Sequence, residues 1–164
     1  MVSLNPILST LIDRFSDHVS DPVEAYGLPT LTVKKEQLLA IFNYLYTTEG
    51  YQFLTTLCGI HLINEIPQKL GVVYHLHNLQ AGSRLRLKTF TPLEDPTFPT
   101  LTGLFESANW MEREAYDFFG ICFDGHPNLT RILNIDDMTV FPMRKDEFLE
   151  DATREDKNDS MFGR

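Results

Sequence analysis

The spacing of apolar residues changes along the chain between the period of a helix and that of a strand. Helical spacing marks three segments, residues 5–15, 34–47 and 109–119. A further short helix is expected around residues 101–105. Strand-like runs occur at residues 23–26, 31–33, 52–60, 71–79, 84–90 and 121–123. The pattern predicts an α+β fold, a two-layer domain whose helices pack on one face of a mostly antiparallel sheet.

Charged, aromatic and turn-forming residues are most concentrated in the segment from Asn109 to Leu133. Its helix is expected to begin with Asn109 as N-cap, with Glu112 placed as in a capping box, and to end at Gly120. The apolar half of the helical wheel, expected to face the core, holds Trp110, Met111, Ala115, Phe118 and Phe119. The opposite half, expected to face outward, holds Glu112, Arg113, Tyr116 and Asp117.

Glu114 is the exception, because its position lies on the apolar half of this helix. A buried carboxylate is costly unless a cation or several donors meet it, so Glu114 is predicted to be a buried polar tie to Arg131 or His126. Arg113 and Asp117 are four residues apart on the outer half, where they form either a solvated ion pair or a contact with a partner. His126, before Pro127, is interpreted as a turn residue that donates a hydrogen bond.

The order of these residues resembles a known family signature. It comprises Glu112-Arg113-Glu114, Asp117, Gly120, Phe123, His126-Pro127, Leu129, Arg131-Ile132-Leu133 and the segment Phe141-Pro142-Met143-Arg144-Lys145-Asp146. It is similar to the signature of the 30 kDa subunit family of respiratory complex I, the bacterial NADH:quinone oxidoreductase. Two positions depart from the family pattern: Thr130 replaces a common basic residue, and Met143 replaces the usual Leu.

The resemblance implies a structural and assembly subunit without a redox centre, in the peripheral arm of a proton-translocating complex. Its partners would be the 49 kDa-type quinone-site subunit and the subunit that carries the terminal [4Fe–4S] cluster. No cofactor is expected in this chain, whereas the complex would contain FMN, iron–sulfur clusters and quinone. The chain would lie peripherally on the cytoplasmic face of the bacterial inner membrane, held there by its partners.

The resemblance also suggests roles for the signature residues. Glu112, Arg113 and Asp117 would contact a partner, while Glu114, His126 and Arg131 would fix the helix to the loop after it. The domain is predicted to span residues 1–144, followed by an extended tail over residues 145–164. Further interface residues on this account are Arg144, Lys145, Phe148 and Phe162, with the two phenylalanines as anchors on the neighbouring protein.

Composition narrows the possible partners. The net charge is −9, from 23 acidic and 14 basic residues, which argues against nucleic acid and against direct docking on anionic lipid. No apolar run is long enough to span a bilayer, and the N-terminus lacks the features of a signal peptide. Residues 84–88 alternate basic and apolar side chains, which predicts either a solvated sheet face or a face that meets an acidic partner.

Candidate catalytic and metal sites are few. Cys58 and Cys122 belong to no CxxC motif and are predicted to be buried, reduced thiols. His75 and His77 share a strand face, but no third ligand is apparent. No nucleophile motif, P-loop or dinucleotide fingerprint occurs. Two alternatives stay open: the equivalent subunit of a membrane-bound [NiFe]-hydrogenase or ferredoxin-driven complex, and a free-standing hydrolase or metal-binding protein.

Overall fold

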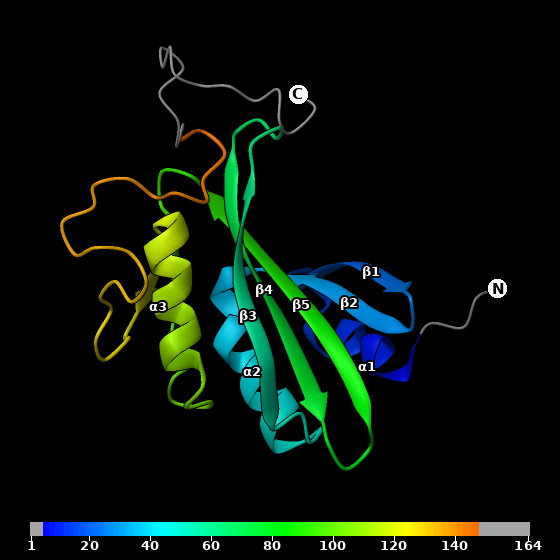
Figure 1. The fold of residues 1–164 in the computed structure, drawn as a ribbon. Coiled ribbons are helices and arrows are strands. Elements are labelled where there is room, and N and C mark those ends of the chain that lie inside the picture. Colours follow the sequence, from blue (N-terminus) through cyan, green and yellow to red (C-terminus); the bar gives the residue numbers. More distant parts are fainter. Residues whose placement is uncertain (1–4, 148–164) are drawn as a thin grey trace, which may run out of the picture.

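The computed structural model describes residues 5–147, which form a five-stranded sheet accompanied by three α-helices (Figure 1). The helices are α1 (Pro6–Phe15), α2 (Leu38–Thr47) and α3 (Ala108–Phe119), with short 3-10 turns at Ser16–His18 and Lys35–Gln37. The strands of the sheet are β1 (Val19–Ala25), β2 (Leu28–Val33), β3 (Phe53–Leu62), β4 (Lys69–Asn78) and β5 (Ser83–Pro92). A separate small ladder pairs β6 (Thr97–Pro99) with β7 (Cys122–Asp124).

The strands of the main sheet lie in the order β1-β2-β5-β4-β3. Strands β2 and β5 run parallel, and the other neighbours are antiparallel. Hairpins account for most of this order. In the β1–β2 hairpin both turn residues, Tyr26 and Gly27, have positive φ (56° and 70°), as the tight primed turns require. The prediction of an α+β fold with a mostly antiparallel sheet is confirmed.

The core lies between this sheet and the helices α1 and α2, which pass behind the sheet in Figure 1. Alternate residues of the central strands point into it; these are Leu70, Val72, Tyr74 and Leu76 on β4, and Leu85 and Leu87 on β5. The intervening residues point to the opposite face, where Val73, His75 and His77 are only half-buried. Neither α1 nor α2 covers that face, which is turned toward the viewer in Figure 1.

Helix α3 lies beside the edge strand β3 (Figure 1). Gly59 allows the close approach, since a Cβ at this position would lie 2.5 Å from Cδ2 of Phe119. Gly120, with φ +74°, ends the helix in the left-handed conformation, as the sequence predicts. This contact fixes the helix that carries the signature residues against the sheet.

Several details of the predicted elements are wrong. Residues 101–105 form turns instead of a helix. Helix α3 begins at Ala108, one residue before Asn109, and its N-cap makes no side-chain hydrogen bond. Cys58 and Cys122 are exposed instead of buried.

Candidate functional site

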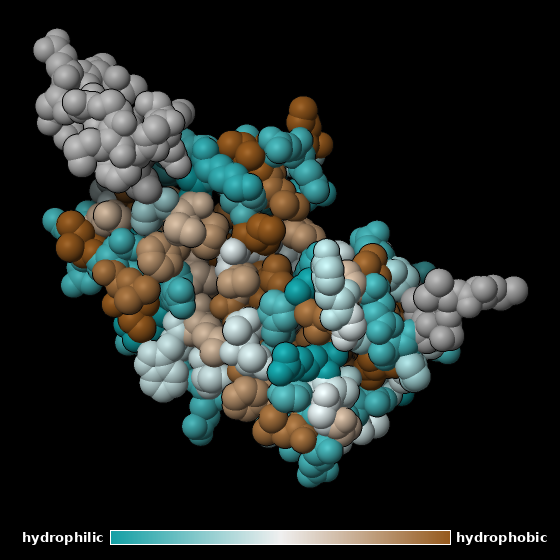
Figure 2. Space-filling view, turned by 45° about the vertical axis from the view of Figure 1, so that its right-hand side comes forward, coloured by the Kyte–Doolittle hydropathy of each residue, from teal (hydrophilic) through white to brown (hydrophobic). Residues whose placement is uncertain are grey.

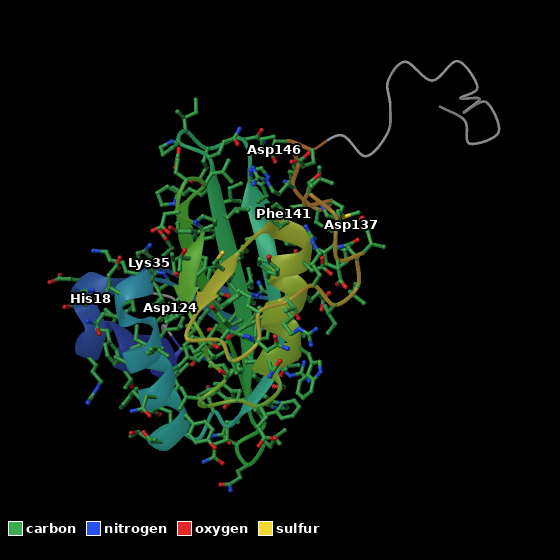
Figure 3. All side chains as sticks on the ribbon, turned by 90° about the vertical axis from the view of Figure 1, so that its left-hand side faces the viewer. His18, Lys35, Asp124, Asp137, Phe141 and Asp146 are labelled. Carbon is green, nitrogen blue, oxygen red and sulfur yellow. The ribbon has the colours of Figure 1, made fainter. Side chains whose placement is uncertain are left out.

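Helix α3 buries two carboxylates that the helical wheel places outside. Glu112 and Asp117 have no exposed surface, while Trp110 is 57% exposed. Glu114, predicted to be the buried tie, is exposed. The wheel fails because α3 is covered by more than β3. The irregular segment that follows β7 covers Asp117 (Figure 3), and residues 100–101 meet Glu112. The second cover is polar backbone, which needs acceptors instead of apolar side chains.

Asp117 accepts five hydrogen bonds from residues 131–134. Its Oδ2 receives the backbone N–H groups of Ile132 (3.1 Å), Leu133 (2.8 Å) and Asn134 (2.9 Å). Its Oδ1 receives Nη1 of Arg131 at 2.7 Å and Nδ2 of Asn134 at 3.1 Å. The predicted Arg113–Asp117 pair is therefore wrong, because every donor to this carboxylate comes from the loop. Burial alone raises the pKa of Asp117, but these donors outweigh burial and hold the pKa well below its usual range.

Arg131 joins three parts of the chain through one guanidinium. Besides the carboxylate, it donates to the carbonyl of Asp117 (2.9 Å) and to the carbonyls of Met138 (2.7 Å) and Val140 (3.2 Å). It also lies over the ring of Phe141, 5.2 Å from the centroid. The prediction that Arg131 fixes the helix to the loop holds, but its partner is Asp117 and not Glu114. We call Asp117, Arg131 and Asn134 the loop clamp.

Two other signature residues support the start of the same segment. Arg113 donates to the carbonyls of Thr130 and Arg131, both at 3.1 Å. His126 accepts the N–H of Asn128 at Nδ1 (3.1 Å), so its Nε2 carries the proton and donates to the carbonyl of Asn109 (3.1 Å). His126 is thus a hydrogen-bonding turn residue in this structure.

Glu112 ties α3 to the chain before it. Its Oε2 accepts from the hydroxyl of Thr100 at 2.6 Å, and its Oε1 accepts the N–H of Leu101 at 2.7 Å. No cation reaches it within residues 5–147, and burial raises its pKa to about 7 although both hydrogen bonds oppose the rise. Nothing in the sequence signals this tie, because Thr100 and Leu101 lie outside the signature.

The chain returns past the C-terminal end of α3, where Phe141 lies (Figure 3). The ring of Phe141 packs edge-on against Tyr116 and lies where a Cβ on Gly120 would meet it at 2.7 Å. Further along, His61 of β3 accepts the N–H of Lys145 at 3.0 Å. His61 is buried and 84 positions away in sequence, so no sequence signal could have connected the two.

The remaining predicted interface residues are placed as follows. Arg144 forms a local two-point pair with Asp146, at 3.0 Å and 2.5 Å. Phe148 and Phe162 lie outside the described residues, so the predicted tail and its boundary at residue 145 stay predictions.

The arrangement is a set of structural ties. The side chains of Glu112, Asp117 and Arg131 form hydrogen bonds with other parts of this chain. Neither carboxylate is therefore free to face a substrate. Within residues 5–147 no group of three or more His, Cys, Asp and Glu residues could hold a metal ion. Over the same range no helix has the length and apolar character needed to cross a membrane.

The sequence is similar to those of known proteins over most of its length. The chain is 39% identical over 155 residues to the C subunit of NADH-quinone oxidoreductase from Citrifermentans bemidjiense, a match that covers 94% of this chain and 96% of the relative. It is 35% identical over 155 residues to the protein of the same name in Geobacter metallireducens, with the same two coverages.

Two solved structures share the fold. A trypsin-resistant fragment of Nqo5 matches with a TM-score of 0.65 and 30% identity, covering 74% of this chain and 98% of the fragment. A chain of the membrane-bound sulfane sulfur reductase, an archaeal respiratory membrane complex, matches with a TM-score of 0.74. Its identity is 20%, over 87% of this chain and 84% of that one, so it supports the fold alone. The family model of the respiratory-chain NADH dehydrogenase 30 Kd subunit matches residues 31–153, and the chain belongs to this family.

Proposed function

We propose that this chain is a structural subunit of a proton-translocating NADH:quinone oxidoreductase. The observation that carries the proposal is the 39% identity to the Citrifermentans bemidjiense protein over nearly the whole length of both chains. The NADH dehydrogenase activity would then belong to the complex, with its FMN, iron–sulfur clusters and quinone bound by other subunits. The chain would sit in the peripheral arm on the cytoplasmic face of the inner membrane, held there by protein partners.

The hydrogen bonds of the signature residues support a role in fixing one part of the chain to another. The loop clamp fixes an irregular segment whose apolar side chains are exposed, including Leu133 (65%), Ile135 (67%) and Met143 (55%). Exposed apolar groups on a segment held by buried polar ties are suited to contact another protein. We therefore assign Asp117 to holding this segment and Glu112 to tying α3 to residues 100–101, in place of the direct partner contacts expected from the sequence.

The partners in this proposal are the 49 kDa-type quinone-site subunit and the subunit with the terminal [4Fe–4S] cluster. The equivalent subunit of a hydrogenase or ferredoxin-driven complex remains the second candidate, because the fold is shared more widely than the function. The two named relatives, at 39% and 35% identity, favour the NADH:quinone oxidoreductase.

The test is a purification of the tagged full-length chain from membranes in mild detergent, followed by an NADH:quinone reductase assay and identification of the co-purified subunits by mass. An active assembly that contains the quinone-site subunit is the expected result. Recovery with a nickel-containing partner would instead support the hydrogenase-type complex. A chain recovered alone would contradict both assignments.

A further inference from the structure

The face of the sheet opposite α1 and α2 carries a row of polar side chains that crosses three strands. Thr56 of β3, His75 of β4 and Arg86 of β5 are register neighbours. Nδ1 of His75 lies 2.8 Å from the hydroxyl of Thr56, and Nε of Arg86 donates to Nε2 of His75 at 2.9 Å. The three side chains therefore form one hydrogen-bonded chain across the sheet.

The hydrogen bonds define the state of the histidine. A guanidinium can only donate, so Nε2 of His75 accepts and the ring is neutral with its proton on Nδ1. Burial and the charge of Arg86 both lower the pKa of His75, which favours the same neutral form. His75 thus engages Nε of Arg86 and orients the guanidinium, while the two terminal nitrogens of Arg86 take no hydrogen bond or ion pair within residues 5–147.

This guanidinium lines a hollow of about 440 Å³. One wall is the β1–β2 turn with Tyr26, another is Thr55 of β3, and Arg84 lies beside Arg86 on β5. Arg84 and Arg86 are two residues apart on the same strand face, a separation of roughly 7 Å. The residues that line the hollow therefore include two arginines and two threonines, with the exposed Tyr26 at its rim.

The charge of this face is opposite to that of the whole chain. Arg84, Arg86 and Lys88 enter no ion pair within residues 5–147, although the full chain has a net charge of −9. The negative charge of the rest of the chain would repel a large polyanion such as a nucleic acid or an anionic membrane. A single acidic side chain is small enough to be attracted by the nearby arginines alone, because more distant charges are screened by salt. Guanidinium groups bind carboxylates with two parallel hydrogen bonds.

We propose that this hollow is a docking site for an acidic segment of a partner protein, in which an Asp or Glu carboxylate binds Arg86 beside Arg84. The site lies on the sheet face, away from the loop clamp, so it gives the chain a second contact with its assembly. The inference rests on the proposed function, because the partner is another subunit of that complex. Figure 2, in which the right-hand side of Figure 1 is turned forward, shows hydrophilic and hydrophobic residues mixed over the visible surface.

The test uses Arg86→Lys in the full-length chain within the purified complex. This change keeps the positive charge and supplies an amine that a zero-length carbodiimide joins to a carboxylate in contact with it. Lys88, on the same strand face but outside the hollow, is the internal control. We expect a cross-link from position 86 to an Asp or Glu of another subunit, at several times the yield of any cross-link from Lys88.

A second pair of variants tests the site without a cross-link. Arg86→Gln and Lys88→Gln each remove one positive charge from the same face. Arg86→Gln should weaken retention of the chain in the complex by about tenfold in salt washes, equivalent to ~1.4 kcal/mol. Lys88→Gln should change retention less than about twofold.

Three outcomes would overturn the inference: no cross-link from position 86 in the assembled complex, a cross-link only to acidic residues of this same chain, or equal retention of the two Gln variants. Failure of the proposed function would be seen separately. In that case the unsubstituted chain would not co-purify with an NADH:quinone reductase at all.

Discussion

Nη1 of Arg131 lies 2.7 Å from Oδ1 of Asp117, and this ion pair joins the irregular segment after β7 to helix α3. Both side chains are buried, with 8% and 0% exposed. The carboxylate also binds three consecutive backbone N–H groups, so the pair stabilises a path of the chain that has no regular secondary structure. Breaking the pair should therefore affect the loop first.

Asp117→Asn should be strongly destabilising. It removes the charge opposite Arg131 and places an amide where several N–H groups converge, which leaves buried donors unpaired. The expected loss in the free energy of unfolding is ~3–5 kcal/mol, measured by urea denaturation. The control is Glu114→Gln on the exposed part of the same helix, which should change stability by less than about 0.5 kcal/mol. Equal effects of the two variants would show that the clamp does not hold the segment.

Glu112 should make the stability of the folded chain depend on pH. Its pKa of about 7 in the folded chain lies above the ordinary value of 4.5, so the folded chain retains a proton that the unfolded chain releases between these values. Its contribution to stability is complete below about pH 4.5 and is lost as the pH rises through about 7, a change of ~3 kcal/mol. Asp117 stays ionised over this range and adds no slope, since its pKa is lowered.

Glu112→Gln tests this directly. Gln cannot ionise, so unfolding free energies measured between about pH 5 and 8 should show the variant gaining up to ~3 kcal/mol relative to the original chain toward high pH. Glu106→Gln, an exposed residue before the same helix, should leave the pH slope unchanged. An unaltered slope in Glu112→Gln would mean that the carboxyl is already ionised at neutral pH.

Tyr74→Phe should be neutral or stabilising. Tyr74 is fully buried and packs against Phe42 at 4.9 Å between centroids, but its hydroxyl has no hydrogen-bond partner within residues 5–147. Removing an unpaired buried hydroxyl should raise the free energy of unfolding by up to ~1 kcal/mol. Tyr51→Phe is the matched control, because the hydroxyl of Tyr51 accepts from Ser83 at 3.2 Å and its loss should cost ~1 kcal/mol. A clear loss of stability in Tyr74→Phe would reveal a polar partner for that hydroxyl.

Gly59→Ala should loosen α3 from the sheet. The new Cβ would lie 2.5 Å from Cδ2 and 3.0 Å from Cγ of Phe119, and Cγ is too near the backbone to move freely. Overpacking of this kind costs ~1–3 kcal/mol and should appear as faster amide exchange in α3. Gly103→Ala has no heavy atom within 4 Å of its Cβ and should leave exchange in α3 unchanged. Unchanged exchange in both variants would contradict close packing of α3 on β3.

The sequence alone determined most of the fold. Period-two alternation in residues 84–90 and helical spacing in residues 6–15 reflect burial on one side only, which any single sheet or helix must satisfy. The end of the helix at Gly120 is equally local, because few residues other than glycine tolerate a positive φ. The family was also evident, since the order of the signature residues is a property of the chain itself.

Which signature residues are buried was decided only by the tertiary structure. A helical wheel assumes one apolar cover, but α3 has a second, polar cover built from residues 126–143, and this reversed the expected places of Glu114 and Asp117. The tie between Glu112 and Thr100 and the link from His61 to Lys145 likewise depend on distant segments meeting. Every residue except proline has the same backbone N–H group, so the sequence does not indicate which acceptor each group will bind; the folded structure decides this.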